Sequence, residues 1–80
     1  MAYHKTKIEK GRIGEFSKIK EEFQELEDAV NQNSKVLIIC ELTDLVGAIE
    51  LYAKQYNLTI DDIIDFSRKT QQAFINGNRK

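Results

Sequence analysis

Two pairs of acidic residues with the same spacing are the part of this sequence that could do chemistry. Glu22 and Glu25 are three residues apart, and so are Glu41 and Asp44. Residues three apart in a helix project from one face, about one turn apart. Two antiparallel helices could therefore bring the four carboxylates together as a hard, all-oxygen site for Mg²⁺ or Mn²⁺.

The second pair is the stronger signal because it lies in the most apolar part of the chain. Glu41 and Asp44 fall within residues 36–53, and no Lys or Arg stands between Lys35 and Lys54. Burying ionised carboxylates side by side costs roughly several kcal/mol each unless a cation compensates them. We infer that a bound divalent cation does so. The first pair, Glu22 and Glu25, would on its own be typical of a solvated helix face. It indicates a metal site only in combination with the second pair.

The sequence offers few softer ligands. His4 is the single histidine and Cys40 the single cysteine, and neither has a spacing from the acids that would add a nitrogen or sulfur ligand. A lone cysteine also cannot form an internal disulfide, which fits a reducing compartment. We therefore expect an all-oxygen metal site and a packed thiol at Cys40.

The elements that must position the acids are helices. The sequence has no proline and only four glycines, and its apolar residues follow helical spacing rather than strand alternation. We predict an all-α chain with an extended basic arm over residues 1–14 and three helices. The helices are expected over about residues 15–30, over about residues 35–56 after an N-cap at Ser34, and from a Thr59–Asp62 capping pair to about residue 75.

The second predicted helix is apolar nearly all round, which is typical of a helix at the centre of a bundle. Two neighbours from the same chain cannot cover it on every side. We therefore expect residues 15–80 to form one helical domain that self-associates as a homo-oligomer, either a dimer or a tetramer. Two chains would then build an intersubunit four-helix bundle.

Composition and charge exclude several classes of function. Of the 80 residues, 41% are apolar and 31% charged, as in a globular domain rather than a disordered chain. The formal net charge is −1, so there is no basic excess to displace counterions from a nucleic acid. The longest strongly apolar run covers only residues 36–40, far short of the roughly 20 residues that span a bilayer. We expect a cytoplasmic protein that binds neither nucleic acid directly nor a membrane.

Two longer stretches carry a family resemblance. KEEFQELEDAV at residues 20–30 and CELTDLVGAIELYA at residues 40–53 resemble the paired E-E-x-x-E and E-x-x-D signature of the MazG-like all-α nucleoside triphosphate pyrophosphohydrolases. The ends of the chain, with YHKTKIEKGRIGEFSKI and NLTIDDI, also resemble compact members encoded by phages, which would act in the host cytoplasm. The resemblance implies an all-α NTP pyrophosphatase fold. It also implies Mg²⁺-dependent hydrolysis of a nucleoside triphosphate to the monophosphate and pyrophosphate, through a metal-activated water.

The resemblance implies a role for each acid. The family's metal ligands fall on Glu22, Glu25, Glu41 and Asp44, and Glu21 matches the leading glutamate of the motif. Glu21 and Glu22 are then the candidate catalytic residues, with Glu21 expected to support the ligands or to orient the attacking water. Mn²⁺ is expected to be able to replace Mg²⁺.

The substrate is less sharply indicated. Lys54, Lys69 and Arg79 are candidate phosphate-binding residues, from the same chain or a partner chain, although a solvated helix surface explains them equally well. No residue identifies the base or the sugar, so phosphoribosyl-ATP pyrophosphohydrolase, a relative with the same fold and similar acidic chemistry, stays open as an alternative. So does a non-catalytic helical oligomer acting as an adaptor or regulator, although such a protein would have no use for buried carboxylates.

Overall fold

The computed structural model describes residues 4–77, and within them the chain is helical. Its elements, in chain order, are α1 (Phe16–Asn31), α2 (Lys35–Ala53), the 3₁₀-helix η1 (Lys54–Tyr56) and α3 (Ile60–Ile75). The predicted all-α class and the three helices are confirmed, although α2 ends at Ala53 and continues as η1 where one longer helix was expected. None of these helices within residues 4–77 is long and apolar enough to cross a bilayer.

The helix starts follow the expected capping chemistry. At the start of α2, the Ser34 hydroxyl accepts a hydrogen bond from the Leu37 N–H at 3.3 Å. At the start of α3, the Thr59 hydroxyl accepts from the Asp62 N–H at 3.1 Å, and the Asp62 carboxylate accepts from the Thr59 N–H at 2.9 Å. These bonds satisfy N–H groups that the start of a helix otherwise leaves unpaired. Both predicted caps are confirmed.

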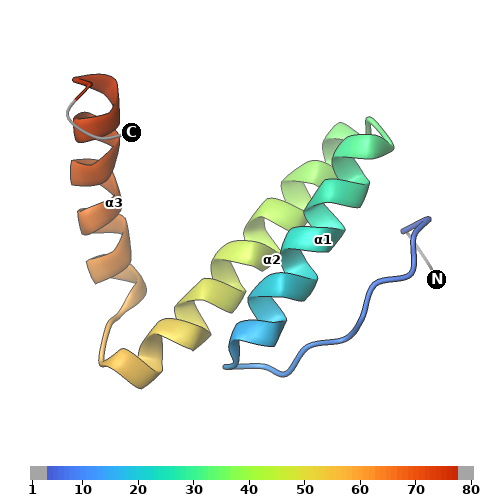
Figure 1. Ribbon diagram of the computed structural model, residues 1–80, viewed down its shortest axis with the longest axis horizontal. Coiled ribbons are helices and arrows are strands. Elements are labelled where there is room, and N and C mark those ends of the chain that lie inside the picture. The colour runs from blue at the N-terminus through green and yellow to red at the C-terminus, as the bar shows by residue number, and fades with distance from the viewer. Residues whose placement is uncertain (1–3, 78–80) are drawn as a thin grey trace.

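α1 and α2 form an antiparallel hairpin, and α3 leaves it at an angle (Figure 1). The turn between α1 and α2 contains Asn33 with a φ of 56°, a left-handed conformation that asparagine tolerates. Asn57, with a φ of 58°, lies between η1 and α3 and redirects the chain there. Across residues 4–77, α3 contacts α2 but not α1. The hairpin is therefore the part of the single chain that can position the two acidic pairs.

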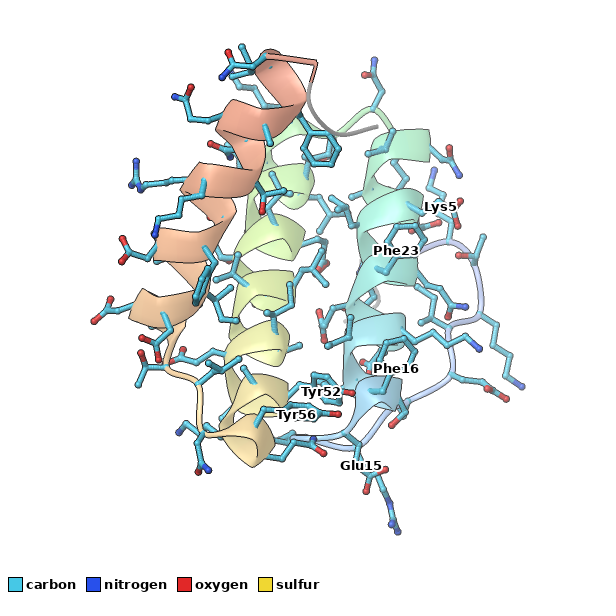
Figure 2. All side chains as sticks on the ribbon, turned by 60° about the vertical axis from the view of Figure 1, so that its left-hand side comes forward. Lys5, Glu15, Phe16, Phe23, Tyr52 and Tyr56 are labelled. Carbon is cyan, nitrogen blue, oxygen red and sulfur yellow. The ribbon has the colours of Figure 1, made fainter. Side chains whose placement is uncertain are left out.

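Aromatic rings close one end of the hairpin. Phe16 of α1 packs edge-on against Tyr52 of α2 with ring centroids 6.0 Å apart, and Tyr52 packs against Tyr56 of η1 at 5.6 Å. Figure 2 shows the three rings together where α1 begins and α2 ends. Edge-to-face pairs contribute about 0.5–1.5 kcal/mol each beyond the area that they bury. They help to fix the register of α1 against α2.

The single chain buries acids more completely than large apolar side chains. Small residues make up the buried apolar core of the described part of the chain: Ala29, Ala48 and Ala53. Four acids are also buried: Glu21, Glu22, Asp28 and Glu41. By contrast, Phe23 is 56% exposed, Val46 49% and Phe66 62%. Cys40, expected to be packed, is exposed as well, because α1 covers only one side of α2. Exposed apolar surface of this kind is typical of an interaction face.

Residues 4–15, which we call the arm, form no helix or strand and run back along α1 (Figure 1). The Gly11 N–H donates to Glu21 Oε1 at 2.8 Å and ties the arm to the helix. A β-carbon at Gly11 would collide with the backbone of Ser17, so glycine is what allows the arm to approach α1 this closely. Residues 1–3 of the expected extended segment lie outside the described residues.

Candidate metal centre

Four carboxylates from the middle turns of α1 and α2 converge. Glu22 and Glu25 lie on α1, Glu41 and Asp44 lie on α2, and each offers one carboxylate oxygen within 4.8 Å of the other three. The three-residue spacing places each pair on one helix face, and the hairpin turns the two faces toward each other. The structure thus brings together the four acids predicted as metal ligands, which we call the acid cluster. They could hold a metal ion.

Two members of the acid cluster are almost fully buried. Glu22 and Glu41 are each 4% exposed, and Glu22 Oε2 and Glu41 Oε1 are buried without a hydrogen-bond partner in the described structure. A buried polar atom left unpaired costs about 1–3 kcal/mol. Asp44 is exposed and borders two surface hollows, one on the Gly47 side and one on the Cys40 side. The cluster therefore has buried ligands at its base and an opening at Asp44.

Crowding changes the protonation of the acid cluster. Burial, together with the charge of Glu22 and other neighbouring acids, raises the pKa of Glu25 from its ordinary 4.5 to about 7. Burial also raises the pKa of Glu41, and the Asp44 carboxylate adds to this, although His4 opposes it. Without a cation, the cluster therefore holds a proton near neutral pH, as expected of carboxylates that share a site.

Lys18 supplies part of the positive charge that the acids require. Its Nζ is 3.1 Å from Glu21 Oε1 and 3.1 Å from Glu22 Oε1. Burial would lower the pKa of Lys18, but the hydrogen bonds to Glu22 and Glu21 outweigh it and raise the pKa. The inference of a metal ion from the lack of a nearby protein cation was therefore incomplete. The sequence shows no cation on the second helix near the acids, but Lys18 reaches them from the first turn of α1.

Glu21 faces the arm and lies outside the four-acid group. Its Oε1 accepts from the Gly11 N–H at 2.8 Å and from Lys18 Nζ at 3.1 Å, and Lys10 Nζ is 3.7 Å from its Oε2. Burial would raise the pKa of Glu21, but the hydrogen bonds from Gly11 and Lys18 lower it. Glu21 thus joins the arm, α1 and the lysine that contacts Glu22. Its catalytic role stays a prediction.

The structure adds His4, which reasoning from the sequence set aside. Its Nδ1 is 2.9 Å from Asp28 Oδ2, and its Nε2 is 2.9 Å from Glu41 Oε2 and 3.9 Å from Glu25 Oε2. Burial would lower the pKa of His4, but the hydrogen bonds to Asp28 and Glu41 and the charges of Glu41 and Glu25 raise it.

His4 was not expected near the acids, yet His4, Glu25 and Glu41 form a second group that could hold a metal ion. The all-oxygen ligand set of the four acids stays a prediction. His4 and Glu41 are 37 residues apart, beyond the reach of any helical spacing rule. The available signal was Gly11, which allows the arm to fold back along α1.

Asp28 is a second functional candidate that the sequence reasoning missed. It is buried, and it accepts hydrogen bonds from the Lys5 N–H at 3.1 Å, Thr6 Oγ1 at 3.1 Å and Gln32 Nε2 at 2.7 Å in addition to His4. Burial would raise the pKa of Asp28, but these donors lower it to about 2. Asp28 is therefore an ionised anchor for the start of the arm.

Two of the three predicted phosphate contacts, Lys54 and Lys69, lie away from the acid cluster in the single chain. Lys54 is in η1, almost three turns after Asp44 and about 15 Å further along the axis. Lys69 lies on α3, which does not contact α1 within the described residues, and its Nζ is 5.7 Å from the centre of the Phe66 ring. Arg79 lies outside the described residues. Phosphate binding by these three residues stays a prediction.

Comparison with known families places this site in a chemical context. Residues 2–69 match the family model described as phosphoribosyl-ATP pyrophosphohydrolase, so the match includes the arm, the hairpin and all four acids. No curated protein and no solved structure matches the chain. The matched family lies in the same all-α NTP pyrophosphatase superfamily as the MazG-like enzymes. Because the match covers most of its length, this chain belongs to the phosphoribosyl-ATP pyrophosphohydrolase family.

Proposed function

We propose that this protein is a Mg²⁺-dependent, MazG-like pyrophosphohydrolase. It cleaves a nucleoside triphosphate between the α- and β-phosphates and releases the monophosphate and pyrophosphate. The family match supports a nucleotide pyrophosphohydrolase activity in general. The observation that carries the proposal is the convergence of Glu22, Glu25, Glu41 and Asp44 within 4.8 Å.

The residues present fit a divalent cation. Glu22 Oε2 and Glu41 Oε1 are buried and unpartnered, so each has a lone pair that no described protein group uses. Carboxylate oxygens are the ligands that Mg²⁺ prefers, and Mn²⁺ accepts the same set. When bound, such a cation neutralises phosphate oxygens and activates water for attack on phosphorus. The acid cluster alone would repel a triphosphate.

The protein's own groups hold the carboxylates in position. Lys18 fixes Glu22 through one oxygen, and the Gly11 N–H together with Lys18 fixes Glu21. Glu21 was expected either to support the metal ligands or to orient the attacking water. These contacts favour support of the ligands, because Glu21 holds Lys18 against Glu22. Asp44, exposed at the mouth of the cluster, is the acid nearest to an incoming substrate from solvent.

A second candidate substrate is phosphoribosyl-ATP, which the name of the matched family favours directly. It carries a further phosphate on its added ribose, and that group requires cations of its own. Within residues 4–77, the cationic side chains that approach the acid cluster are His4 and Lys18, and both are paired with carboxylates. We therefore place nucleoside triphosphates first.

We also propose that the active form is a homo-oligomer, a dimer or a tetramer. The exposed apolar faces of α2 and α3 support this, because the single chain leaves Val46 and Phe66 about half exposed or more. A partner chain packed on these faces would complete a four-helix bundle. It could also bring Lys54 or Lys69 to the phosphates.

One assay tests the function. Full-length protein is incubated with Mg²⁺ and, separately, with each of the NTPs, the dNTPs and phosphoribosyl-ATP, and pyrophosphate is measured. We expect release from at least one nucleoside triphosphate, and none in chelator. Turnover of phosphoribosyl-ATP alone would establish the second candidate. No turnover of any substrate, with no metal binding, would favour the non-catalytic adaptor.

A further inference from the structure

We propose that His4 is a nitrogen ligand of a divalent cation that Glu25 and Glu41 also bind, and that Asp28 positions its imidazole. This inference deepens the proposed function, since it rests on a cation occupying the acid cluster. It adds an unexpected ligand from the arm.

The geometry of the imidazole carries the inference. Nδ1 of His4 is 2.9 Å from Asp28 Oδ2, and Nε2 faces the acid cluster, 2.9 Å from Glu41 Oε2 and 3.9 Å from Glu25 Oε2. One nitrogen of His4, one oxygen of Glu41 and one oxygen of Glu25 can therefore reach a common ion, since the candidate ligand atoms of this group lie within 4.8 Å of one another. Metal-ligating histidines typically donate their other ring N–H to a carboxylate in this way.

Asp28 has the properties that such a positioning residue needs. It is only 4% exposed and holds the arm through the Lys5 N–H and Thr6 Oγ1 as well as His4. The backbone on the C-terminal side of His4 is thereby fixed, and the ring has little freedom to turn. A carboxylate opposite Nδ1 selects the state in which Nδ1 carries a proton, and this leaves Nε2 for a cation.

An unpaired oxygen of Glu41 independently indicates a bound cation. The Glu41 side chain is buried, and only Oε2 meets His4, whereas Oε1 has no partner among the described groups. A purely structural ion pair would leave that oxygen unsatisfied. A cation beside Glu41 satisfies it. The ion replaces the Nε2 proton, which leaves to solvent, while Nδ1 keeps its proton and donates it in a hydrogen bond to Asp28.

A mixed oxygen and nitrogen ligand set changes the choice of metal. Imidazole favours first-row transition ions, whereas Mg²⁺ prefers oxygen ligands and water. We therefore expect Mn²⁺ to bind more tightly than Mg²⁺, and this preference should depend on His4.

The test uses Mn²⁺ alone, without substrate, on tag-free full-length protein. Because His4 is the only histidine in the chain, protein grown with ¹⁵N-labelled histidine carries a label at one imidazole. Pulsed electron paramagnetic resonance of bound Mn²⁺ should show a directly coordinated nitrogen whose coupling changes between ¹⁴N-histidine and ¹⁵N-histidine. Bound Mn²⁺ without histidine coupling would overturn the proposal while leaving the metal centre and the pyrophosphohydrolase activity intact. No Mn²⁺ binding would overturn both the proposal and the metal centre.

Variants supply a second readout. His4→Ala should weaken Mn²⁺ binding at least about tenfold and Mg²⁺ binding less, and Asp28→Asn should weaken Mn²⁺ binding by about tenfold as well. Lys5→Ala is the matched control, because only the backbone N–H of Lys5 contacts Asp28. It should change the affinity less than about twofold. Unchanged or tighter Mn²⁺ binding in His4→Ala would mean that His4 is a counter-cation that metal displaces, and would contradict the proposal.

Discussion

Glu22 and Glu41 each place one carboxylate oxygen on a protein donor and keep the other oxygen unpaired. Lys18 contacts Oε1 of Glu22, and His4 contacts Oε2 of Glu41. The remaining oxygens, Glu22 Oε2 and Glu41 Oε1, are both buried. The donors therefore orient the carboxylates, and a cation would take the free oxygens.

Binding of Mg²⁺ or Mn²⁺ should stabilise the folded protein. A ligand that binds only the folded state at a hundredfold excess over its Kd contributes about 2.7 kcal/mol. Asp44→Asn removes one ligand charge and should lose most of this gain, whereas Glu27→Gln, an exposed acid of α1 outside the acid cluster, should keep it. The measurement is Tm in millimolar metal and in chelator. Identical melting curves for the wild type under the two conditions would count against a metal centre.

The unfolding free energy of the metal-free protein should fall as pH rises from about 5 to 8. The pKa of Glu25 is about 7 in the folded state against an ordinary 4.5, so ionisation of Glu25 favours the unfolded chain. His4 acts in the same direction, since its pKa is raised and the stabilisation from its charged form is lost as pH rises. The expected loss is on the order of 2 kcal/mol.

Denaturant unfolding in chelator at the two pH values measures this slope. Glu25→Gln removes the Glu25 contribution and should make the unfolding free energy depend less on pH. Saturating Mg²⁺ should oppose the loss of stability at high pH, because the metal ion competes with the proton for the carboxylates. A stability that rises with pH in chelator would show that the acids are not crowded in solution.

The four acids were predictable and their supporting residues were not. Helical spacing is a local rule, so the sequence alone pairs Glu22 with Glu25 and Glu41 with Asp44. The contact of His4 with Glu41 depends on how the arm folds back over α1, and no local rule describes that path.

At the scale of elements, Gly11 controls the path of the arm. Gly11→Ala would place a β-carbon against the backbone of Ser17, so the arm must move and its hydrogen bond to Glu21 must break. We expect a loss of about 1–3 kcal/mol in stability. Trypsin should also cleave faster at the lysines of the arm.

Glu9→Ala, at an exposed position of the same arm, is the control and should match the wild type in Tm and cleavage rate. An unchanged Gly11→Ala protein would mean that the arm does not lie against α1 in solution.

Helix limits were predictable because capping chemistry is local. Ser34 and the Thr59–Asp62 pair mark the starts of α2 and α3 in the sequence and in the structure. The end of α2 was less predictable, because no strong signal in the sequence marks the 3₁₀ turn of η1. The angle at which α3 leaves the hairpin depends on Asn57 and on what packs against α3, which the sequence does not specify.

At the scale of the whole molecule, the exposed apolar surface predicts self-association. We expect a dimer or a tetramer by sedimentation at micromolar concentration, and a Tm that rises with protein concentration because folding and assembly are coupled. Val46→Lys puts a charge on the exposed apolar face of α2 and should lower Tm or yield a smaller species. Glu27→Lys, on α1, should do neither. A folded 9.3 kDa monomer at micromolar concentration would contradict this prediction.

We propose that the acid cluster performs metal-dependent cleavage of a nucleotide pyrophosphate bond. The most direct test of this proposal is pyrophosphate release from the preferred nucleotide in Mg²⁺, compared between wild type and Asp44→Asn at equal helical content. We predict Mg²⁺-dependent release by the wild type and a loss of at least about 100-fold in Asp44→Asn, the scale on which removing one well-placed catalytic group acts. Wild-type turnover in Asp44→Asn would contradict the assignment.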